Sequence, residues 1–547
     1  MKKIISLFLL FICVPIGQST AQLTFPLTKK IDESSFNWIK NNVSAETGFP
    51  LSFSVESDKK MKMYQKIGAS DSVTGIIERL IVEEGVSIYD TALWQIALLA
   101  VDGEENVNKA AIPINAYWNG QLRELNNIRA GYGGGQYFVY NTIFPEAISA
   151  DLQEFGHRGF IFRILNAHGK YLSKDPLDEK TYFKDFPNWP DIHWEDWKPI
   201  AGENAWVVIA AMHVYHKKYF NHLSQKYEGP KEPLEVMLAE ELARAAIMLQ
   251  AENGAVRMSP ISTYYFFVED IKTLDADAVA IELDQRAVIS EKVYKDFIKV
   301  YGHERAFLDS TYTTWYFNEI STENNLSWYT AFNLLYEITK EQKYFDAKNR
   351  IETYLKSVWN NEEYYFYQGA HFIDGAWVPN KDHFATDVQT WGISKLTPKQ
   401  IDEWFGEGRA FRLWDTSKKY SGVYDPEGRL LGLGYTKEND RVSIEWTVGA
   451  IYALHEVAEY YQYSHPQWSE LAMQDAVQMR SGIEKYRSQL TAEMSAYSYS
   501  SRRGWIPFGW FSHDADVLSL VSTCWVFLYD AGFNPFKLDR SSESGKN

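Results

Sequence analysis

The sequence contains very little cysteine, with only Cys13 and Cys524 among 547 residues. Cys13 lies in an apolar N-terminal run, so the chain beyond that run cannot form an internal disulfide. Such a chain must be stabilised by its hydrophobic core, and this one is long enough to bury a large core. No Pro-rich or Gly/Ser-rich linker divides it. We therefore expect one domain over residues 22–540, followed by a polar tail over residues 541–547.

Long uncharged apolar runs are also missing after the N-terminus. Lys2 and Lys3 precede an apolar run over residues 4–17, and Ser19-Thr20-Ala21 follows it in the small-x-small pattern that a signal peptidase cuts. The run is too short to cross a membrane. The sequence thus predicts a signal peptide over residues 1–21 and a periplasmic or secreted protein with no integral membrane segment.

Positive charge is in deficit, because 55 basic residues stand against 72 acidic ones and give a formal charge of −17. This excludes nucleic acid as an expected partner and favours neutral substrates over sulfated or uronate-rich polymers. His213 and His216 lie three apart on an apolar stretch, with no His-Glu-x-x-His motif, and no Gly-x-Ser-x-Gly elbow is present. We therefore expect neither a metal nor a cofactor.

Aromatic residues are abundant, at 16% of the chain, and several tryptophans belong to a recurring unit. In this unit a polar or acidic turn precedes or contains a Trp and leads into a strongly apolar helical stretch. Six such units are found, at residues 89–100, 202–219, 324–338, 386–391 and onward, 443–460, and 522–525 and onward.

The six stretches are apolar on all sides, so each must be buried on all sides. Amphipathic helices with one polar face separate them, at residues 234–249, 344–358 and 471–483 among others. Alternation of buried and half-exposed helices favours an all-α fold, an α/α toroid of about six inner and six outer helices with aromatic-rich loops at one face. A generic helix bundle is the alternative.

Acidic residues stand at the starts of four inner helices: Asp90, Glu203, Asp387 and Glu445. A single such residue is best interpreted as a helix cap. Four such acids on buried helices of one ring indicate a shared site, because their side chains would converge on one cavity. We therefore predict these four as the catalytic candidates.

Aromatic segments without helical pattern precede several of these starts, at residues 186–197, 129–137 and 502–514. Their Pro, Asn and Gly content indicates loops. Aromatic rings with a polar edge suit the flat faces of sugars, although packing of the loops onto the barrel is an equal alternative. The predicted substrate-binding residues are Arg129, Tyr132, His193, Trp194, Trp197, Trp206, Trp391, Trp446 and Trp510.

With its six helix starts from Tyr89 to Trp525, the chain resembles the six-hairpin glycosidases, a superfamily of α/α toroids. That superfamily includes glucoamylase-like enzymes, endoglucanases and β-1,2-glucan-degrading enzymes. The resemblance is one of architecture and implies an inverting hydrolase with an acid and a base on opposite sides of a cavity. Gly202-Glu203-Asn204-Ala205-Trp206 is similar to the acid position, and Ser443-Ile444-Glu445-Trp446 to the base position.

The chemistry of acetal cleavage explains why two carboxyl groups are needed. One protonates the leaving oxygen, and the other activates water or stabilises the oxocarbenium-like centre. We predict Glu203 as the acid, and Glu445 as the base ahead of Asp387 and Asp90. The substrate is then an oligo- or polysaccharide, with a neutral glucan favoured by the charge balance.

Two other functions remain open at this point. A polysaccharide lyase on the same toroid would remove a proton beside a uronate with His193, His383, Tyr264 or Tyr265, helped by Arg129, Arg502 and Arg503. A non-catalytic glycan-binding envelope protein would keep the toroid without using its carboxylates. A lyase makes an ultraviolet-absorbing product and a hydrolase does not, so a spectrophotometric assay separates the two enzymes.

Overall fold

The computed structural model describes residues 30–45, 47–60, 62–63, 81–127, 160–161, 163–166, 193–196, 200–259, 316–438, 440–508, 510–513 and 515–540. Six of its helices are buried along nearly their whole length. They are α4 (Ile88–Leu99), α8 (Ala201–Tyr219), α15 (Thr322–Thr339), α17 (Thr386–Leu396), α20 (Ile444–Tyr461) and α22 (Leu520–Asp530). These are the six predicted apolar units, so that prediction is confirmed.

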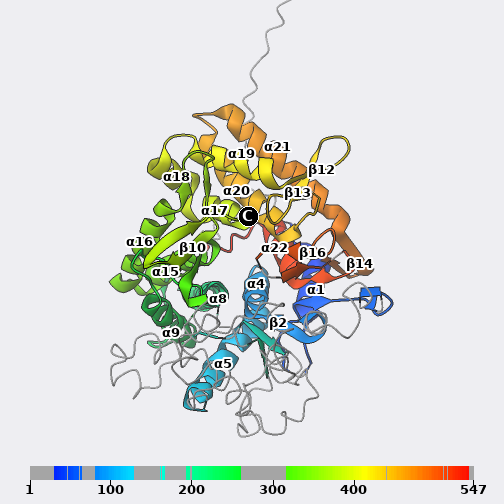
Figure 1. Ribbon diagram of the computed structural model, residues 1–547. Helices are drawn as coiled ribbons and strands as arrows, with labels where there is room; N and C mark the ends of the chain where they lie inside the picture. The colour runs from blue at the N-terminus through cyan, green and yellow to red at the C-terminus, as the bar shows by residue number, and fades with distance from the viewer. Residues whose placement is uncertain are drawn as a thin grey trace, which may run out of the picture.

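The buried helices close into a ring. Each packs against the next in the order α4, α8, α15, α17, α20 and α22, and α22 packs back against α4. Figure 1 shows this ring around the centre of the molecule. The fold is therefore an α/α toroid, as the sequence predicts.

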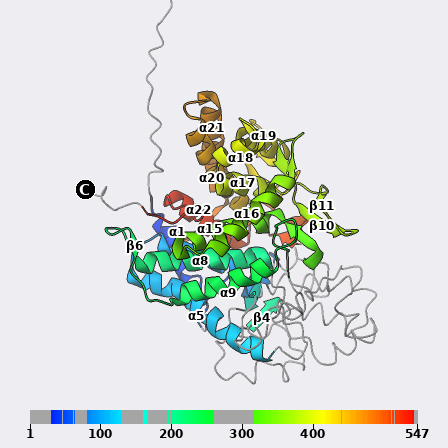
Figure 2. The ribbon, with the colours of Figure 1, turned by 90° about the vertical axis from the view of Figure 1, so that its left-hand side faces the viewer.

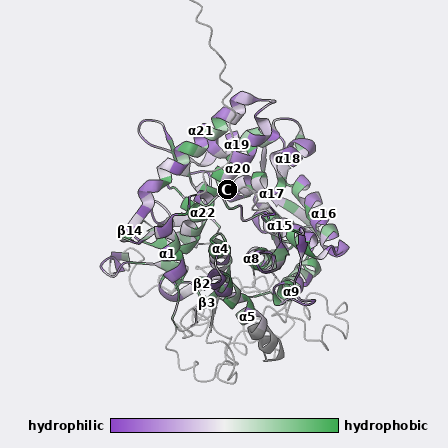
Figure 3. Cartoon of the chain, turned by 180° about the vertical axis from the view of Figure 1, so that it is seen from behind, coloured by the Kyte–Doolittle hydropathy of each residue, from purple (hydrophilic) through white to green (hydrophobic). Residues whose placement is uncertain are grey.

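A second layer of helices surrounds the ring. It contains α1 (Glu33–Asn41), α5 (Glu104–Asn127), α9 (Leu234–Met248), α16 (Gln342–Ser357), α18 (Pro398–Phe405), α19 (Arg409–Ser421) and α21 (Pro466–Ile483). Each of these helices packs against one or two inner helices, for example α9 against α8 and α21 against α20. Figure 3 shows hydrophilic residues mostly on the outside and hydrophobic residues towards the ring. The amphipathic pattern thus marks the outer layer correctly.

Among the described residues, short antiparallel strands and two 3-10 turns connect the helices. The strands are β1 (Phe53–Ser54), β2 (Gly85–Ser87), β3 (Ile164–Asn166), β4 (His193–Asp196), β5 (Phe220–Asn221), β6 (Lys226–Tyr227), β7 (Glu319–Ser321), β8 (Trp359–Asn360), β9 (Tyr365–Phe366), β10 (Gly369–Ile373), β11 (Ala376–Asn380), β12 (Gly422–Tyr424), β13 (Leu430–Leu433), β14 (Arg487–Thr491), β15 (Met494–Tyr497), β16 (Gly504–Ile506), β17 (Trp510–Ser512) and β18 (Leu518–Ser519). The turns are Tyr316–Asn318 and Glu484–Tyr486. The larger sheets are β2-β3-β4 and β11-β10-β7. Strands β2, β7 and β18 lead directly into the inner helices α4, α15 and α22.

Two of these strand regions correct the sequence prediction. The irregular structure predicted for residues 186–197 is wrong for His193–Asp196, which pair with β3. It is also wrong within residues 502–514, where β16 and β17 form a hairpin. Aromatic residues suit a pleated strand once a partner strand is present, and long-range pairing of this kind leaves little trace in the local sequence.

The starts of the inner helices are joined by backbone hydrogen bonds. The amide groups of Ile88, Ala201, Thr322, Thr386, Ile444 and Leu520 donate to the carbonyls of Arg163, Met258, Gln368, Tyr435, Tyr499 and Ser52. Each carbonyl belongs to the segment that precedes the next inner helix of the ring, so the bonds fix the helix starts relative to one another. We call this set of hydrogen bonds the mouth belt.

One side chain on each inner helix reinforces the mouth belt. The fourth residue after every N-cap returns a hydrogen bond to the N-cap carbonyl: Thr91, Asn204, Asn325, Gln389, Thr447 and Thr523. Asn204, Asn325 and Gln389 also bind both the N–H and the C=O of a residue in a neighbouring segment. Because a buried backbone group left unpaired is costly, these side chains fix where each helix begins.

Aromatic rings fill the centre of the toroid below the helix starts. Trp206, Trp391 and Trp525 contact one another, with ring centroids 5.5–6.0 Å apart. Phe536, from the segment after α22, packs against all three at 5.7–6.3 Å. Figure 2 shows α22, the helix before Phe536, on one side and the β10–β11 hairpin on the other. We call Trp206, Trp391, Trp525 and Phe536 the aromatic floor.

In the described part of the chain, no helix combines the length and the apolar character that a membrane crossing requires.

Candidate active site

Carboxylates occupy the first turn of five inner helices. They stand two or three residues after the N-cap: Asp90 on α4, Glu203 on α8, Glu323 on α15, Asp387 on α17 and Glu445 on α20. The mouth belt fixes these first turns at one end of the ring. The structure therefore brings the four predicted acids to a common mouth and adds Glu323, which the sequence analysis missed.

Asp90 and Glu203 lie on adjacent helices and influence each other. Asp90 is 5% exposed, and its burial raises its pKa to about 7. Hydrogen bonds from Ser52 and Ser87 oppose the rise, while the charge of Glu203 adds to it. Glu203 itself is partly exposed, unlike the other three predicted acids. The pair thus combines a carboxyl that holds its proton near neutral pH with a less buried one.

Glu445 holds its proton still more strongly. Burial raises its pKa to about 8; a hydrogen bond from Tyr89 opposes the rise, and the charges of Asp90, Asp387 and Glu323 add to it. The Tyr89 hydroxyl donates to Glu445 Oε1 and accepts a 3.0 Å hydrogen bond from Trp525 Nε1. A tyrosine and a tryptophan therefore fix the orientation of this carboxyl.

Glu323 and Asp387 form the third part of the mouth, together with the buried Lys395. Burial raises the pKa of both carboxyls, the charge of Glu323 raises it further for Asp387, and the Lys395 ammonium opposes the rise for both. Asp387 Oδ1 accepts a hydrogen bond of 2.8 Å from the Val388 amide. Carboxyls from five consecutive inner helices thus act on one another electrostatically.

A signal for Glu323 exists in the sequence. Glu323 follows the N-cap Ser321 by two residues and precedes Asn325, which binds the N-cap carbonyl. Glu445 has the same relation to Ser443 and Thr447. The acidic position is therefore defined by its distance from the N-cap.

The predicted tryptophans take two different places. Trp206 and Trp391 belong to the aromatic floor and are 1% and 2% exposed. Trp446 is buried in a side wall, where its ring lies 4.8 Å from Tyr435 and 6.1 Å from Phe508. Trp510 is half-buried in the same wall and donates a 3.0 Å hydrogen bond to the Tyr499 hydroxyl.

The other residues named from the sequence fall into three groups. Arg129, Tyr132 and Trp197 lie outside the described residues, as do Tyr264 and Tyr265. His193 and Trp194 are in β4, the edge strand of the sheet that leads into α4, and only their backbone is described. Arg502 forms an ion pair with Asp440, and the Arg503 guanidinium lies 4.1 Å from the Phe511 ring centroid.

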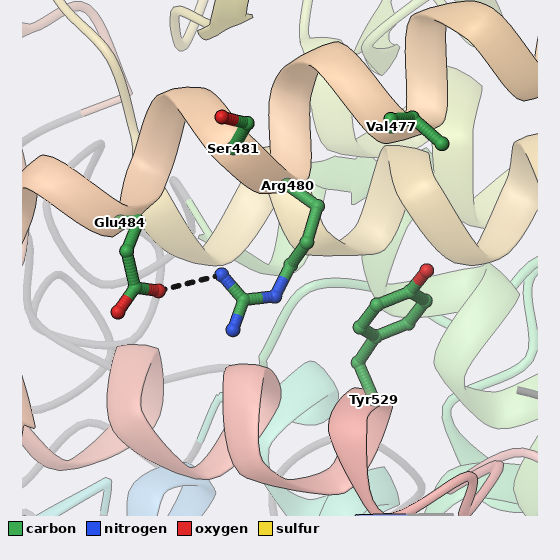
Figure 4. Close-up of a pocket in the computed structure, with 5 residues that line it drawn as sticks. All are labelled: Val477, Arg480, Ser481, Glu484 and Tyr529. Atoms are coloured by element: carbon green, nitrogen blue, oxygen red, sulfur yellow. Dashed lines mark hydrogen bonds and ion pairs between the residues drawn. The ribbon is translucent and has the colours of Figure 1, made fainter. Parts of the chain in front are cut away.

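A hollow of about 330 Å³ lies elsewhere, between α21 and α22 (Figure 4). Its lining residues are Val477, Arg480, Ser481, Glu484 and Tyr529. Arg480 binds Glu484 at 2.8 Å and Asp530 at 2.6 and 3.0 Å, so its charge is already neutralised. The hollow sits at the C-terminal ends of these helices, away from the mouth, and is not the candidate site. Within the described residues, no three His, Cys, Asp or Glu side chains are grouped as metal ligands.

The ring of helix pairs and the carboxylates at its mouth define an α/α-toroid protein with an acidic centre. No family model and no curated protein matches the sequence.

The chain is similar to solved structures of carbohydrate-processing toroids. A sugar epimerase from a ruminal bacterium has a TM-score of 0.49 at 10% identity, over 92% of this chain and 97% of that chain. A cellobiose 2-epimerase from Bacillus thermoamylovorans has 0.45 at 10%, over 86% and 97%. A GH76A alpha-1,6-mannanase from Salegentibacter has 0.42 at 9%, over 91% and 96%. At such values the chemistry has to be argued from the site itself.

Proposed function

We propose that the protein is a glycoside hydrolase that cleaves a neutral oligo- or polysaccharide with two carboxyl groups of the mouth. The observation that carries the proposal is that the carboxyls of five inner helices interact at the mouth and differ in how strongly they hold a proton. Glu445 and Asp90 retain a proton near neutral pH, and Glu203 is the least buried of the four predicted acids. Hydrolysis of an acetal requires one protonated and one ionised carboxyl at the same centre.

The two sides of the ring favour particular roles for these groups. In the order of the inner helices, α8 and α20 are separated by two helices in either direction, so Glu203 and Glu445 start from opposite sides of the mouth. A raised pKa suits a proton donor, so we propose Glu445 as the acid and Glu203 as the carboxylate that activates water. This exchanges the roles that the sequence analysis gave to the two residues. A pair on opposite sides leaves room for water and is typical of inversion.

The proposal is tested by product analysis with the purified protein. A panel of neutral and uronate-containing glycans is incubated with it, and mass spectrometry, ultraviolet absorbance and NMR of the new anomeric proton follow the products. We expect a neutral glycan, with a glucan as the first candidate, to gain one water per cleaved bond and to release the inverted anomer. An ultraviolet-absorbing product would instead show a lyase. A product of unchanged mass would show an isomerisation, and binding without turnover would show a glycan-binding protein.

We also propose that the protein is exported and loses residues 1–21, which lie outside the described residues. The pattern at Ser19-Thr20-Ala21 supports cleavage before Gln22. Mass spectrometry of the protein from a periplasmic or culture fraction should give an N-terminus at Gln22. A full-length chain retained in the cytoplasm would contradict the proposal.

A further inference from the structure

A lysine is buried directly beneath the carboxylates, and the proposed hydrolysis gives it no role. Lys395, in the last turns of α17, is 8% exposed. Its Nζ donates to Ser327 Oγ at 2.9 Å, and that hydroxyl donates to Glu323 Oε1, also at 2.9 Å. A continuous chain of hydrogen bonds thus leads from the floor of the toroid to the mouth.

The surroundings of Lys395 act on its charge in opposing directions. The Nζ atom lies 4.2, 5.0 and 5.2 Å from the ring centroids of Trp391, Phe536 and Trp206. The faces of aromatic rings attract a cation, most strongly where water is excluded. Burial lowers the pKa of Lys395 to about 7, and the nearby carboxylates of Glu323 and Asp387 oppose that fall. The aromatic floor and the two acids therefore oppose the cost of burying the ammonium.

The two carboxyls above Lys395 are placed to carry one charge between them. Glu323 and Asp387 lie in the first turns of adjacent helices, where the positive end of each helix dipole stabilises an anion. Two like charges so close disfavour each other, and one buried cation offsets one of them. The other acidic groups at the mouth are Glu203 on α8, Asp90 and Tyr89 on α4 and Glu445 on α20, with Cys524 of α22 near Asp90. Of these, Glu445 interacts with both members of the pair.

We propose that Lys395 is a positioning residue that, through Ser327, holds one negative charge on the Glu323–Asp387 pair. The catalytic role of this charge rests on the proposed hydrolysis, whereas the charge state of the Glu323–Asp387 pair does not. In the order of the ring, α15 and α17 lie between α8 and α20. The charge is thus placed on the arc of the mouth between Glu203 and Glu445. Fixed negative charge there stabilises the positive charge that develops on the sugar in the transition state.

Replacement of the lysine tests this arrangement. In Lys395→Met the pair loses its counter-ion, so the proton whose loss gives the pair its single negative charge should leave only at higher pH. We expect kcat to fall about 10-fold or more with KM changed less than about twofold, because the charge acts on the transition state. The acidic limb of the pH–rate profile should move up by about one pH unit or more. Lys399→Met, four residues on and exposed, is the matched control and should change neither quantity.

Infrared spectroscopy at neutral pH measures the protonation of the carboxyls without any substrate. Lys395→Met should gain the signal of one protonated carboxyl relative to wild type, and this gain should vanish when Glu323→Gln and Asp387→Asn are added. Ser327→Ala, which breaks the chain but keeps the ammonium, should show a smaller gain. An unchanged spectrum in a folded Lys395→Met protein would overturn the proposal. If wild type cleaves no glycan, the hydrolase proposal fails, while the infrared result still decides the charge state.

Discussion

Replacing Glu445 or Glu203 by glutamine should lower kcat on a natural glycan by about 100- to 10,000-fold, the range for loss of a general acid or base. Glutamine keeps the shape of each side chain and removes its proton chemistry. Tyr89 can still donate to the amide oxygen in Glu445→Gln, so the mouth should keep its geometry. Steady-state kinetics on the substrate found in the glycan panel measure the effect.

A glycoside with an activated leaving group then separates the two roles. A good leaving group departs without protonation. The loss of kcat in Glu445→Gln should therefore be at least about 10-fold smaller on such a substrate, whereas the loss in Glu203→Gln should be unchanged. The exposed Glu459 on the same helix as Glu445 supplies the control, and Glu459→Gln should have wild-type rates. Recovery in Glu203→Gln alone would restore the roles predicted from the sequence.

The pH–rate profile provides a further reading of the same assignment. The pKa of Glu445 is raised to about 8, so the proton donor should be present below that pH and lost above it. Activity of the wild type should accordingly decline as the pH rises through about 8. With the activated substrate this alkaline limb should weaken, because the donor is no longer required.

Truncation of Phe536 should destabilise the whole ring. This side chain is 5% exposed and contacts Trp206, Trp391 and Trp525, which come from three inner helices. We expect Phe536→Ala to lower the free energy of unfolding by about 3–5 kcal/mol, the cost of removing a buried phenylalanine and leaving a cavity. Denaturant unfolding followed by tryptophan fluorescence measures the loss.

Two variants make that result specific. Tyr463→Ala removes a ring that is 84% exposed and should change the stability by less than about 0.5 kcal/mol. Phe536→Leu retains most of the buried volume and should recover much of the loss. If Phe536→Ala behaves like Tyr463→Ala, the C-terminal segment does not close the floor.

The helix ring could be predicted because its signal is local. An inner helix must be apolar on every side, and stretches such as residues 206–212 show this directly in the sequence. The strands could not be predicted, since β4 pairs with β3 and β18 with β1 across long distances in the chain. Local composition contains almost no information about such partners.

The site was partly predictable for a related reason. An acid in a first helical turn is visible in the sequence, so four carboxyls could be named. Lys395 and Tyr89 could not, because their importance arises only when α17 meets α15 and α4 meets α20. Nor could the sequence show that Trp206 and Trp391 face each other below the mouth, where they line the floor.

The spacing at the six helix starts separates architecture from chemistry. The side chain four residues after each cap secures the framework, while the positions two and three residues after it present groups to the mouth. Evolution can therefore exchange a reactive group without loosening the scaffold that presents it. A ring built in this way offers up to six independently replaceable positions at the mouth, and α22, which has no acid in its first turn, already differs from the other five helices there.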